Sequence, residues 1–245
     1  MENDPVTRTQ PKSCPCCGDT GLEQLQSIAS APVNSVRLIA DKQQAKEFPS
    51  GQITLVACTA CSFVFNADFK SDLVTYDLGY ESTQAFSQTY RTFMQGVVQR
   101  LVSRYGLEGK RVIEVGCGQG EILEQLRLAG VGSITGFDPA FDPTRPAFQR
   151  SSTVDVVATR FEQPTEGNPA DLVACLMTLE HIEAPLMFLQ TLSESLKHKP
   201  DAVLYLQIPN AEKLFSDAAF WDVYYEHACY FSEVSLRSLA RAAGL

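Results

Sequence analysis

The sequence predicts an α/β fold, in which helices cover both faces of a parallel sheet, with a small cysteine-rich module before it. Strand-like and helix-like segments alternate from residue 111 onward, and the strand-like runs are continuously apolar. Such runs are typical of parallel strands buried on both faces. Two Cys-x-x-Cys pairs near the N-terminus define the module, and 245 residues of which 44% are hydrophobic suffice for one domain and a smaller one.

The cysteine spacing predicts a structural zinc site. Cys14 and Cys17 form one pair, and Cys58 and Cys61 form the other. Four thiolates on two such turns can surround Zn²⁺ as a tetrahedron, and a redox pair or unrelated thiols is the alternative. We expect residues 1–70 to form the zinc-binding module, with strands at 52–57 and 63–65. The other cysteines are expected to be bystanders or small core residues: Cys16, Cys117, Cys175 and Cys229.

A connecting segment, residues 71–106, carries an amphipathic helix. Apolar residues recur at intervals of three and four from Thr83 to Tyr105, and Gly106 follows as a C-cap. The predicted apolar face consists of Phe86, Tyr90, Phe93, Val97, Leu101 and Tyr105.

Residues 107–245 are expected to form the main domain. The predicted strands are 111–115, 133–137, 154–158, 172–177 and 202–208. The predicted helices are 121–129, 185–196 and 233–243, the last with Ser232 as its N-cap. The chain stops where a further strand is due, so we expect the C-terminal strands of the sheet to be missing and its last strand to be an open edge.

A glycine-rich turn, Gly116-Cys-Gly-Gln-Gly120, joins the first of these strands to a helix. Ligands bind at such turns in parallel sheets. The dinucleotide fingerprint needs glycine where this chain has Glu121, and the Gly-Lys-Ser/Thr of a P-loop is absent. Asp138 ends the next strand, where its carboxylate can accept hydrogen bonds from a diol. A nicotinamide cofactor, or a turn without a ligand, remains an alternative at this point.

The run from Val112 to Gly120, with Asp138 after the next strand, resembles motif I and the ribose-binding acid of class I methyltransferases that use S-adenosyl-L-methionine (SAM). The resemblance implies a Rossmann-like sheet with SAM at the glycine turn. The residues that it places around SAM are Glu114, Gly116, Cys117, Gly118, Asp138, Pro139, Phe161 and Met177.

Two further segments contain histidine in a motif-like setting. Leu179-Glu-His-Ile182, with Pro185 after it, resembles a run common to small-molecule class I methyltransferases, in which His181 is either structural or catalytic. The segment from Phe220 to Ser232 resembles the Tyr-x-Glu-His-x-x-Tyr-Phe-Ser signature of the sugar C-methyltransferases of deoxysugar biosynthesis, which also carry an N-terminal zinc module. This resemblance implies that the active site contains Tyr224, Glu226 and His227, covered by Tyr76 and Tyr80.

Methylation of carbon requires removal of a proton next to a carbonyl. A histidine of near-neutral pKa suits that step, and Tyr224 could stabilise the enolate oxygen. The alternative is a hydrogen-bonded aromatic lid without proton transfer. The chain has Gly118-Gln-Gly120 where the sugar enzymes have Asn-Asp-Gly, and Met177 where they have an asparagine four residues before the histidine. A nucleotide-linked keto sugar is therefore a candidate acceptor.

The composition limits the partners. A net charge of −9 and a pI near 4.9 disfavour nucleic acid, and residues 1–70 contain six Lys or Arg against seven Asp or Glu. An RNA methyltransferase, and a catalytically silent module that binds SAM or a partner, are the other readings. No run of 18 apolar residues and no signal peptide occur, so we expect a cytoplasmic protein without a membrane span that acts on a small molecule.

Overall fold

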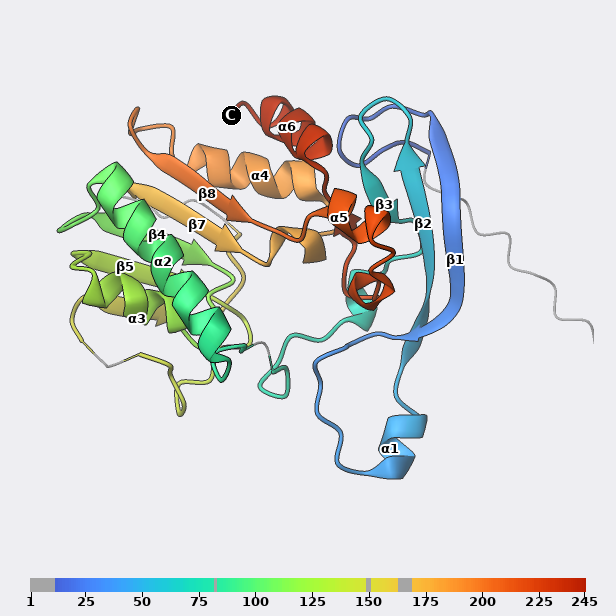
Figure 1. Ribbon diagram of the computed structural model, residues 1–245, viewed down its shortest axis with the longest axis horizontal. Coiled ribbons are helices and arrows are strands. Elements are labelled where there is room, and N and C mark those ends of the chain that lie inside the picture. The colour runs from blue at the N-terminus through green and yellow to red at the C-terminus, as the bar shows by residue number, and fades with distance from the viewer. Residues whose placement is uncertain (1–11, 82, 149–150, 163–168) are drawn as a thin grey trace, which may run out of the picture.

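The computed structural model describes residues 12–81, 83–148, 151–162 and 169–245, which form two sheets (Figure 1). The larger sheet has five parallel strands in the order β6-β5-β4-β7-β8. Its strands are β4 (Arg111–Val115), β5 (Ser133–Phe137), β6 (Val154–Val157), β7 (Leu172–Leu176) and β8 (Val203–Gln207). The predicted parallel α/β sheet is confirmed, with β8 as one of its edges.

Helices cover both faces of this sheet (Figure 1). α2 (Gln88–Tyr105) and α3 (Glu121–Leu128) lie on one face, and α4 (Pro185–Glu194) and α6 (Glu233–Ala242) lie on the other. Successive side chains of a strand point to opposite faces. Accordingly, Val112 of β4 packs with α2 and α3, whereas Ile113 and Val115 pack with α4 and α6.

The helix of the connecting segment differs from its prediction in start and in buried face. It begins at Gln88, where the Ser87 side chain accepts a hydrogen bond from Tyr90 N, and ends at the predicted cap Gly106 with φ of 59°. Phe86 and Phe93 are 80% and 54% exposed. The buried residues of the helix are Met94, Val97, Val98 and Val102, and Tyr90 and Leu101 pack against the same core. The predicted apolar face is therefore confirmed at Tyr90, Val97 and Leu101 and wrong at Phe86, Phe93 and Tyr105, whose side chains are exposed.

The smaller sheet is antiparallel, in the order β1-β2-β3-β9. Its strands are β1 (Leu22–Pro32), β2 (Ser50–Cys58), β3 (Val64–Asn66) and β9 (Cys229–Tyr230). The sequence predicts β2 and β3 but not β1 or β9. β9 comes from the C-terminal part of the chain and pairs Cys229 with Phe65, so both ends of the described chain build this sheet. The boundaries at residues 70 and 106 stay predictions.

One apolar core runs from the smaller sheet to the larger one. It contains Phe63 next to β3, Phe231 after β9, Val173 of β7 and Leu239 of α6. The rings of Phe63 and Phe231 lie 5.1 Å apart. α6 starts at the predicted cap, where Ser232 and Ser235 form a capping box. The remaining helical segments are α1 (Lys42–Lys46), η1 (Ser71–Leu73), η2 (Leu179–His181), α5 (Ala211–Ser216) and η3 (Phe220–Asp222).

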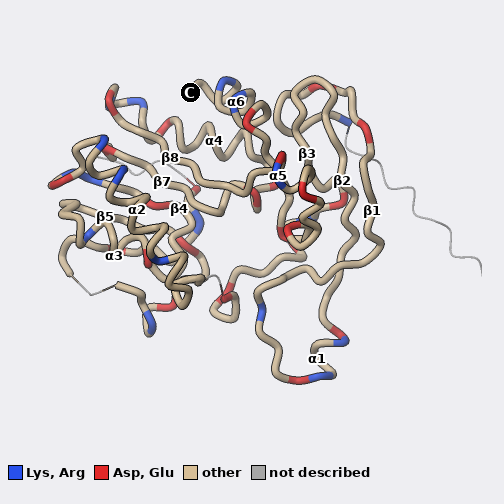
Figure 2. The backbone as a smooth tube through the Cα atoms, in the orientation of Figure 1, with Lys and Arg blue, Asp and Glu red and all other residues tan. Residues whose placement is uncertain are grey.

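Charged residues of both signs are intermixed over the described chain (Figure 2). Among the described residues, no helix has the length and apolar character needed to cross a membrane.

Candidate active site

The glycine turn of residues 116–120 lies at the carboxyl edge of the five-stranded sheet. It follows the central strand β4, and the strand order reverses beside it, with β5 and β6 on one side and β7 and β8 on the other. Asp138 directly follows β5, and Met177 directly follows β7. Loops from three neighbouring parallel strands therefore meet where ligands bind in such sheets.

Backbone amides of this turn are already bonded within the protein. Gly116 N and Cys117 N donate to the carbonyl of Phe137 at 2.8 and 3.2 Å. Gly118 N donates to Oδ2 of Asp138 at 2.8 Å. Phosphate-binding turns leave such amides free for the ligand. The three amides are not available here, which agrees with the glycine spacing in arguing against a dinucleotide.

Three carboxylates surround the turn. Burial raises the pKa of Glu114 well above its usual range, and the charges of Glu121 and Asp138 raise it further. Glu114 is 2% exposed, and its Oε2 has no hydrogen-bond partner among the described residues. Burial also raises the pKa of Asp138, against the hydrogen bonds from Ala140 N and Gly118 N that lower it. A cationic ligand would be stabilised at this turn, and a phosphate would be repelled.

Thr178 fixes the start of the turn, and no sequence motif points to this residue. Gly116 has φ of 77°, and a Cβ there would lie 1.9 Å from Oγ1 of Thr178. The position therefore requires glycine for both backbone and space. The Thr178 hydroxyl donates to the carbonyl of Leu176 at 3.0 Å. Only the spatial contact between the loops after β4 and β7 identifies this residue.

Gln119 is a second residue that sequence reasoning missed. Its side chain is buried, donates from Nε2 to the carbonyl of Ala140 at 3.1 Å, and accepts at Oε1 from Asp142 N at 3.2 Å. It therefore ties the glycine turn to the loop that follows Asp138.

The other residues predicted to contact SAM differ in exposure. Met177 is 40% exposed and has φ of 49°, a left-handed conformation that is unfavourable for a side chain of this size. Pro139 is exposed. Phe161 is buried with its ring 5.0 Å from that of Phe137. The structure thus places Met177 and Pro139 where a ligand can reach them and packs Phe161 in the core, and their contacts with SAM stay predictions.

A second group of predicted residues converges from three segments. The rings of Tyr224 and His227 lie 4.0 Å apart, and those of His181 and His227 lie 5.1 Å apart. The hydroxyl of Tyr76 lies 3.1 Å from Nδ1 of His181, and its ring packs against Tyr80 at 5.0 Å. The loop before α2, the turn after β7 and the segment before β9 therefore build one aromatic cluster.

Main-chain carbonyls fix the tautomers of both histidines. Nδ1 of His181 lies 3.1 Å from the carbonyl of Glu226, and Nδ1 of His227 lies 3.1 Å from that of Asp222. A carbonyl oxygen only accepts, so each Nδ1 carries the hydrogen and each Nε2 carries a lone pair. The Tyr76 hydroxyl oxygen, also 3.1 Å from Nδ1 of His181, then accepts from the same hydrogen. Burial lowers the pKa of His181 to about 4; burial and the neighbouring His181 lower that of His227 to about 3. The expected near-neutral pKa is therefore wrong, and both rings are neutral at pH 7.

Glu226 is fully buried, and its carboxylate is bonded to the N-terminal part of the chain. Oε1 accepts from the Asn34 amide at 3.2 Å, and Oε2 accepts from Ser35 N at 2.6 Å and from the Ser35 hydroxyl. Burial raises the pKa of the Tyr80 phenol, and the charge of Glu226 raises it further. These contacts suit an anchor of the segment 224–227 better than a proton-transfer group.

The loop after β7 reaches both the glycine turn and the aromatic cluster. Thr178 contacts Gly116, and His181 follows it by three residues, which span at most about 10 Å. The loop after β7 therefore connects the two groups.

The four predicted zinc ligands lie together. One sulfur from each of Cys14, Cys17, Cys58 and Cys61 lies within 4.8 Å of the other three. The Cys14–Cys61 and Cys17–Cys58 sulfur separations are 3.7 and 3.6 Å. Thiolates at about 2.3 Å from a tetrahedral Zn²⁺ are about 3.8 Å apart, whereas a disulfide needs about 2 Å. The sulfur positions therefore fit a zinc ion.

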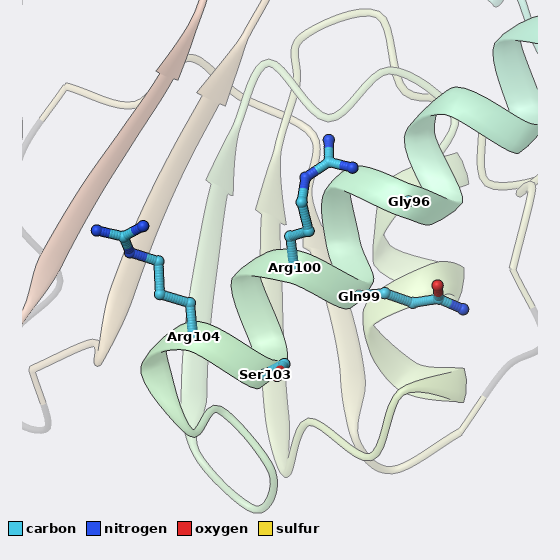
Figure 3. A pocket seen from close by; sticks show the side chains of 5 residues that line it. All are labelled: Gly96, Gln99, Arg100, Ser103 and Arg104. Atoms are coloured by element: carbon cyan, nitrogen blue, oxygen red, sulfur yellow. The ribbon is translucent and has the colours of Figure 1, made fainter.

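A surface hollow lies on α2, away from the predicted residues. Its lining side chains are Gly96, Gln99, Arg100, Ser103 and Arg104 (Figure 3). Arg100 and Arg104 extend from the same side of the helix, as their spacing of four residues requires. No residue of the glycine turn or of the aromatic cluster lines this hollow.

Residues 90–245 match a protein family described as "Methyltransferase domain". Curated relatives match a shorter stretch. A ubiquinone biosynthesis O-methyltransferase of Actinobacillus pleuropneumoniae serotype 7 (strain AP76) is 33% identical over 115 residues, 43% of this chain and 48% of that protein. Its counterpart in Vibrio cholerae serotype O1 (strain ATCC 39541) is 33% identical over 98 residues, 38% of this chain and 40% of that protein. The alignments thus span less than half of these relatives.

Solved structures of similar topology include a chain from the complex between the Haloferax volcanii Trm112 methyltransferase activator and a putative methyltransferase. It aligns with a TM-score of 0.49 at 20% identity, over 64% of this chain and 73% of that chain. The N-methyltransferase NodS of Bradyrhizobium japonicum WM9 aligns with a TM-score of 0.48 at 17% identity, over 63% and 83%.

Proposed function

Because this chain belongs to the methyltransferase-domain family, we propose that it is an enzyme that transfers the methyl group of SAM to a small molecule. The glycine turn carries the proposal. Its amides are bonded within the protein, and the carboxylates of Glu114, Glu121 and Asp138 surround it. SAM is a sulfonium cation with an ammonium group, so this charge pattern suits it and disfavours a pyrophosphate.

The chain offers groups for each part of SAM. Glu114, with its unpartnered oxygen, would face the positive charge of the methionine portion. Asp138 would accept from the ribose hydroxyls, and Gly116, Cys117 and Gly118 would form the floor. SAM, when bound, supplies an electrophilic methyl group. Met177, Pro139 and Phe161 complete the proposed set around the adenine and the methyl group.

We also propose that Cys14, Cys17, Cys58 and Cys61 hold a structural zinc ion. Their sulfur separations support this proposal. Four protein ligands leave no open position, so the ion would stabilise the module without a chemical role. None of the eight cysteines, all of which the structure describes, forms a disulfide, and this also supports our proposal of a cytoplasmic location.

For the acceptor, we propose a keto compound methylated on carbon, with a nucleotide-linked sugar as the candidate. Nε2 of His227 carries a lone pair at pH 7 and would take the proton next to the carbonyl. The charge of Glu226 raises the pKa of this histidine against burial and so stabilises the imidazolium that forms. Tyr224 keeps its phenolic hydrogen because burial raises its pKa, and it would donate to the enolate oxygen. His181, Tyr76 and Tyr80 would position these groups.

Methylation of a hydroxyl group on a small molecule is the second candidate. The names of the relatives from Actinobacillus and Vibrio favour it. The same Nε2 of His227 would then remove the hydroxyl proton. The two candidates differ in the acceptor atom and share the site.

The test is His227→Asn in the purified protein. We expect loss of methyl transfer by at least about 100-fold, the usual contribution of a general base, with SAM affinity within a factor of two by calorimetry. Keto sugars and phenols should each be tested as acceptors, with the release of S-adenosylhomocysteine as the measurement. Substantial activity in the variant would remove the base role, and absence of SAM binding by the unaltered protein would refute the methyltransferase proposal.

A further inference from the structure

Glu180 is a buried carboxylate that the proposed reaction does not use. It lies in η2, directly before His181, and is 1% exposed. Neither Oε1 nor Oε2 has a hydrogen-bond partner among the described residues. A buried carboxyl group without partners costs several kcal/mol unless it stays protonated or meets a cation.

Two histidines face this carboxylate. One ligating atom each of Glu180, His181 and His227 lies within 4.8 Å of the other two. Nδ1 of each ring is bonded to a main-chain carbonyl, which leaves Nε2 as the nitrogen with a lone pair. Histidine ligands of metal ions are held in this way, with the second nitrogen donating to a carbonyl or a carboxylate.

We propose that Glu180, His181 and His227 form a binding site for a divalent first-row transition metal ion. Two imidazoles and one carboxylate are a donor set that such ions accept, with further positions left for an exogenous ligand. The ion would supply the cationic partner that the Glu180 carboxylate lacks among the described residues. This site is separate from the four cysteines, because it uses nitrogen and oxygen donors from η2 and the segment before β9.

The ion and a proton would compete for Nε2 of His227. This consequence rests on the proposed function: with a metal ion on Nε2 of His227, the enzyme cannot remove the proton of its acceptor. The site would therefore make methyl transfer sensitive to the available divalent metal.

The experiment uses Co²⁺ as a probe in protein whose cysteine site retains zinc. We expect one bound Co²⁺ per chain, with visible d–d absorption and without sulfur-to-cobalt charge-transfer absorption. Glu180→Gln should weaken Co²⁺ binding at least about tenfold, and the exposed neighbour Glu183→Gln should leave it unchanged. Thermal melting of each variant checks that it is folded.

Equal Co²⁺ affinity in Glu180→Gln and the unaltered protein would overturn the proposal, as would absence of any Co²⁺ beyond the cysteine site. If Glu180→Gln does not fold, His227→Asn replaces it, with the same expected loss and the same overturning result. The binding readout does not depend on methyl transfer. If Co²⁺ binds at this site and methyl transfer continues unchanged, the base role of His227 fails while the metal site stands.

Discussion

Among single residues, Glu114 has the electrostatic surroundings that bear most directly on which ligand the glycine turn binds. It lies in β4, one residue before the end of the strand and two residues after Val112, so it points to the face that packs with α2 and α3. Burial raises its pKa, and the charges of Glu121 and Asp138 raise it further. A carboxyl group whose pKa is raised by folding holds its proton to a higher pH in the folded state than in the unfolded chain. Its contribution to stability is complete below its unfolded pKa and is lost as pH rises through the raised value.

SAM binding should release a proton from Glu114. A nearby cation lowers the pKa of a carboxyl group, so we expect release of up to about one proton per SAM at pH 7. Calorimetry in two buffers of different ionisation enthalpy measures this number. Glu114→Gln should lower the release, whereas Glu194→Gln on the exposed side of α4 should not. Identical proton release in Glu114→Gln and the unaltered protein would contradict the assignment.

At the level of elements, the segment before β9 is joined to the smaller sheet by close packing. Tyr225 is 1% exposed and packs with Ile53 of β2 and Val74. Its hydroxyl accepts from Lys70 N at 3.0 Å. Gly51 of β2 leaves the space for the ring, because a Cβ there would lie 2.2 Å from Tyr225. This packing holds Glu226 and His227, the next two residues, in place.

Gly51→Ala should destabilise the protein by about 2 kcal/mol, the usual cost of forcing extra volume into a packed site. Chemical denaturation followed by circular dichroism measures the change. Gly96→Ala on α2 is the matched control, because its Cβ would meet only the flexible end of Arg100, and alanine favours a helix by up to about 1 kcal/mol. A Gly51→Ala variant as stable as the control would show that the Tyr225 ring moves at little cost.

At the scale of the whole molecule, the cysteine module and the larger sheet share one core. Cys14, Cys58 and Phe63 belong to the same apolar cluster as Val173 of β7 and Leu239 of α6. Cys16 is fully buried, and its Sγ lies 3.8 Å from the carbonyl oxygen of Ser235 in α6. Loss of order in the module would therefore expose apolar surface of the main domain.

Cys58→Ser should reduce the zinc content of the purified protein to well below one per chain and lower the melting temperature of the entire chain. Cys16→Ala should keep the zinc, because Cys16 is outside the group of four sulfurs. Metal analysis and differential scanning calorimetry are the measurements. A melting profile in which only a minor transition shifts would contradict the shared core as the cause.

The alternation of buried and polar segments predicted the larger sheet well. All five of its strands agree with the predicted ranges to within one residue at each end, because continuous apolar runs and glycine turns are local signals. β1 could not be predicted in this way. Nine of its 11 residues are exposed, so its sequence carries no apolar pattern, and pairing with β2 holds it in place.

Some residues of the candidate site could likewise be predicted from the sequence, and others could not. Resemblance and spacing predicted the glycine turn, Asp138, the four cysteines and the histidine segments as candidate sites, because each is a short motif with its own chemistry. Thr178, Gln119 and the anchoring of Glu226 by Asn34 and Ser35 could not be found, since each depends on a contact between distant segments.

The sequence by itself determined the fold class, the cysteine pairs and the positions of the two histidines. Only the tertiary structure decided the state of those histidines. Their Nδ1 atoms are fixed by carbonyls, and their neutral form follows from burial. It also decided that Glu180 lies beside them without a hydrogen-bond partner among the described residues. The physical reason is that desolvation and charge proximity depend on packing between segments, which no local pattern of residues encodes.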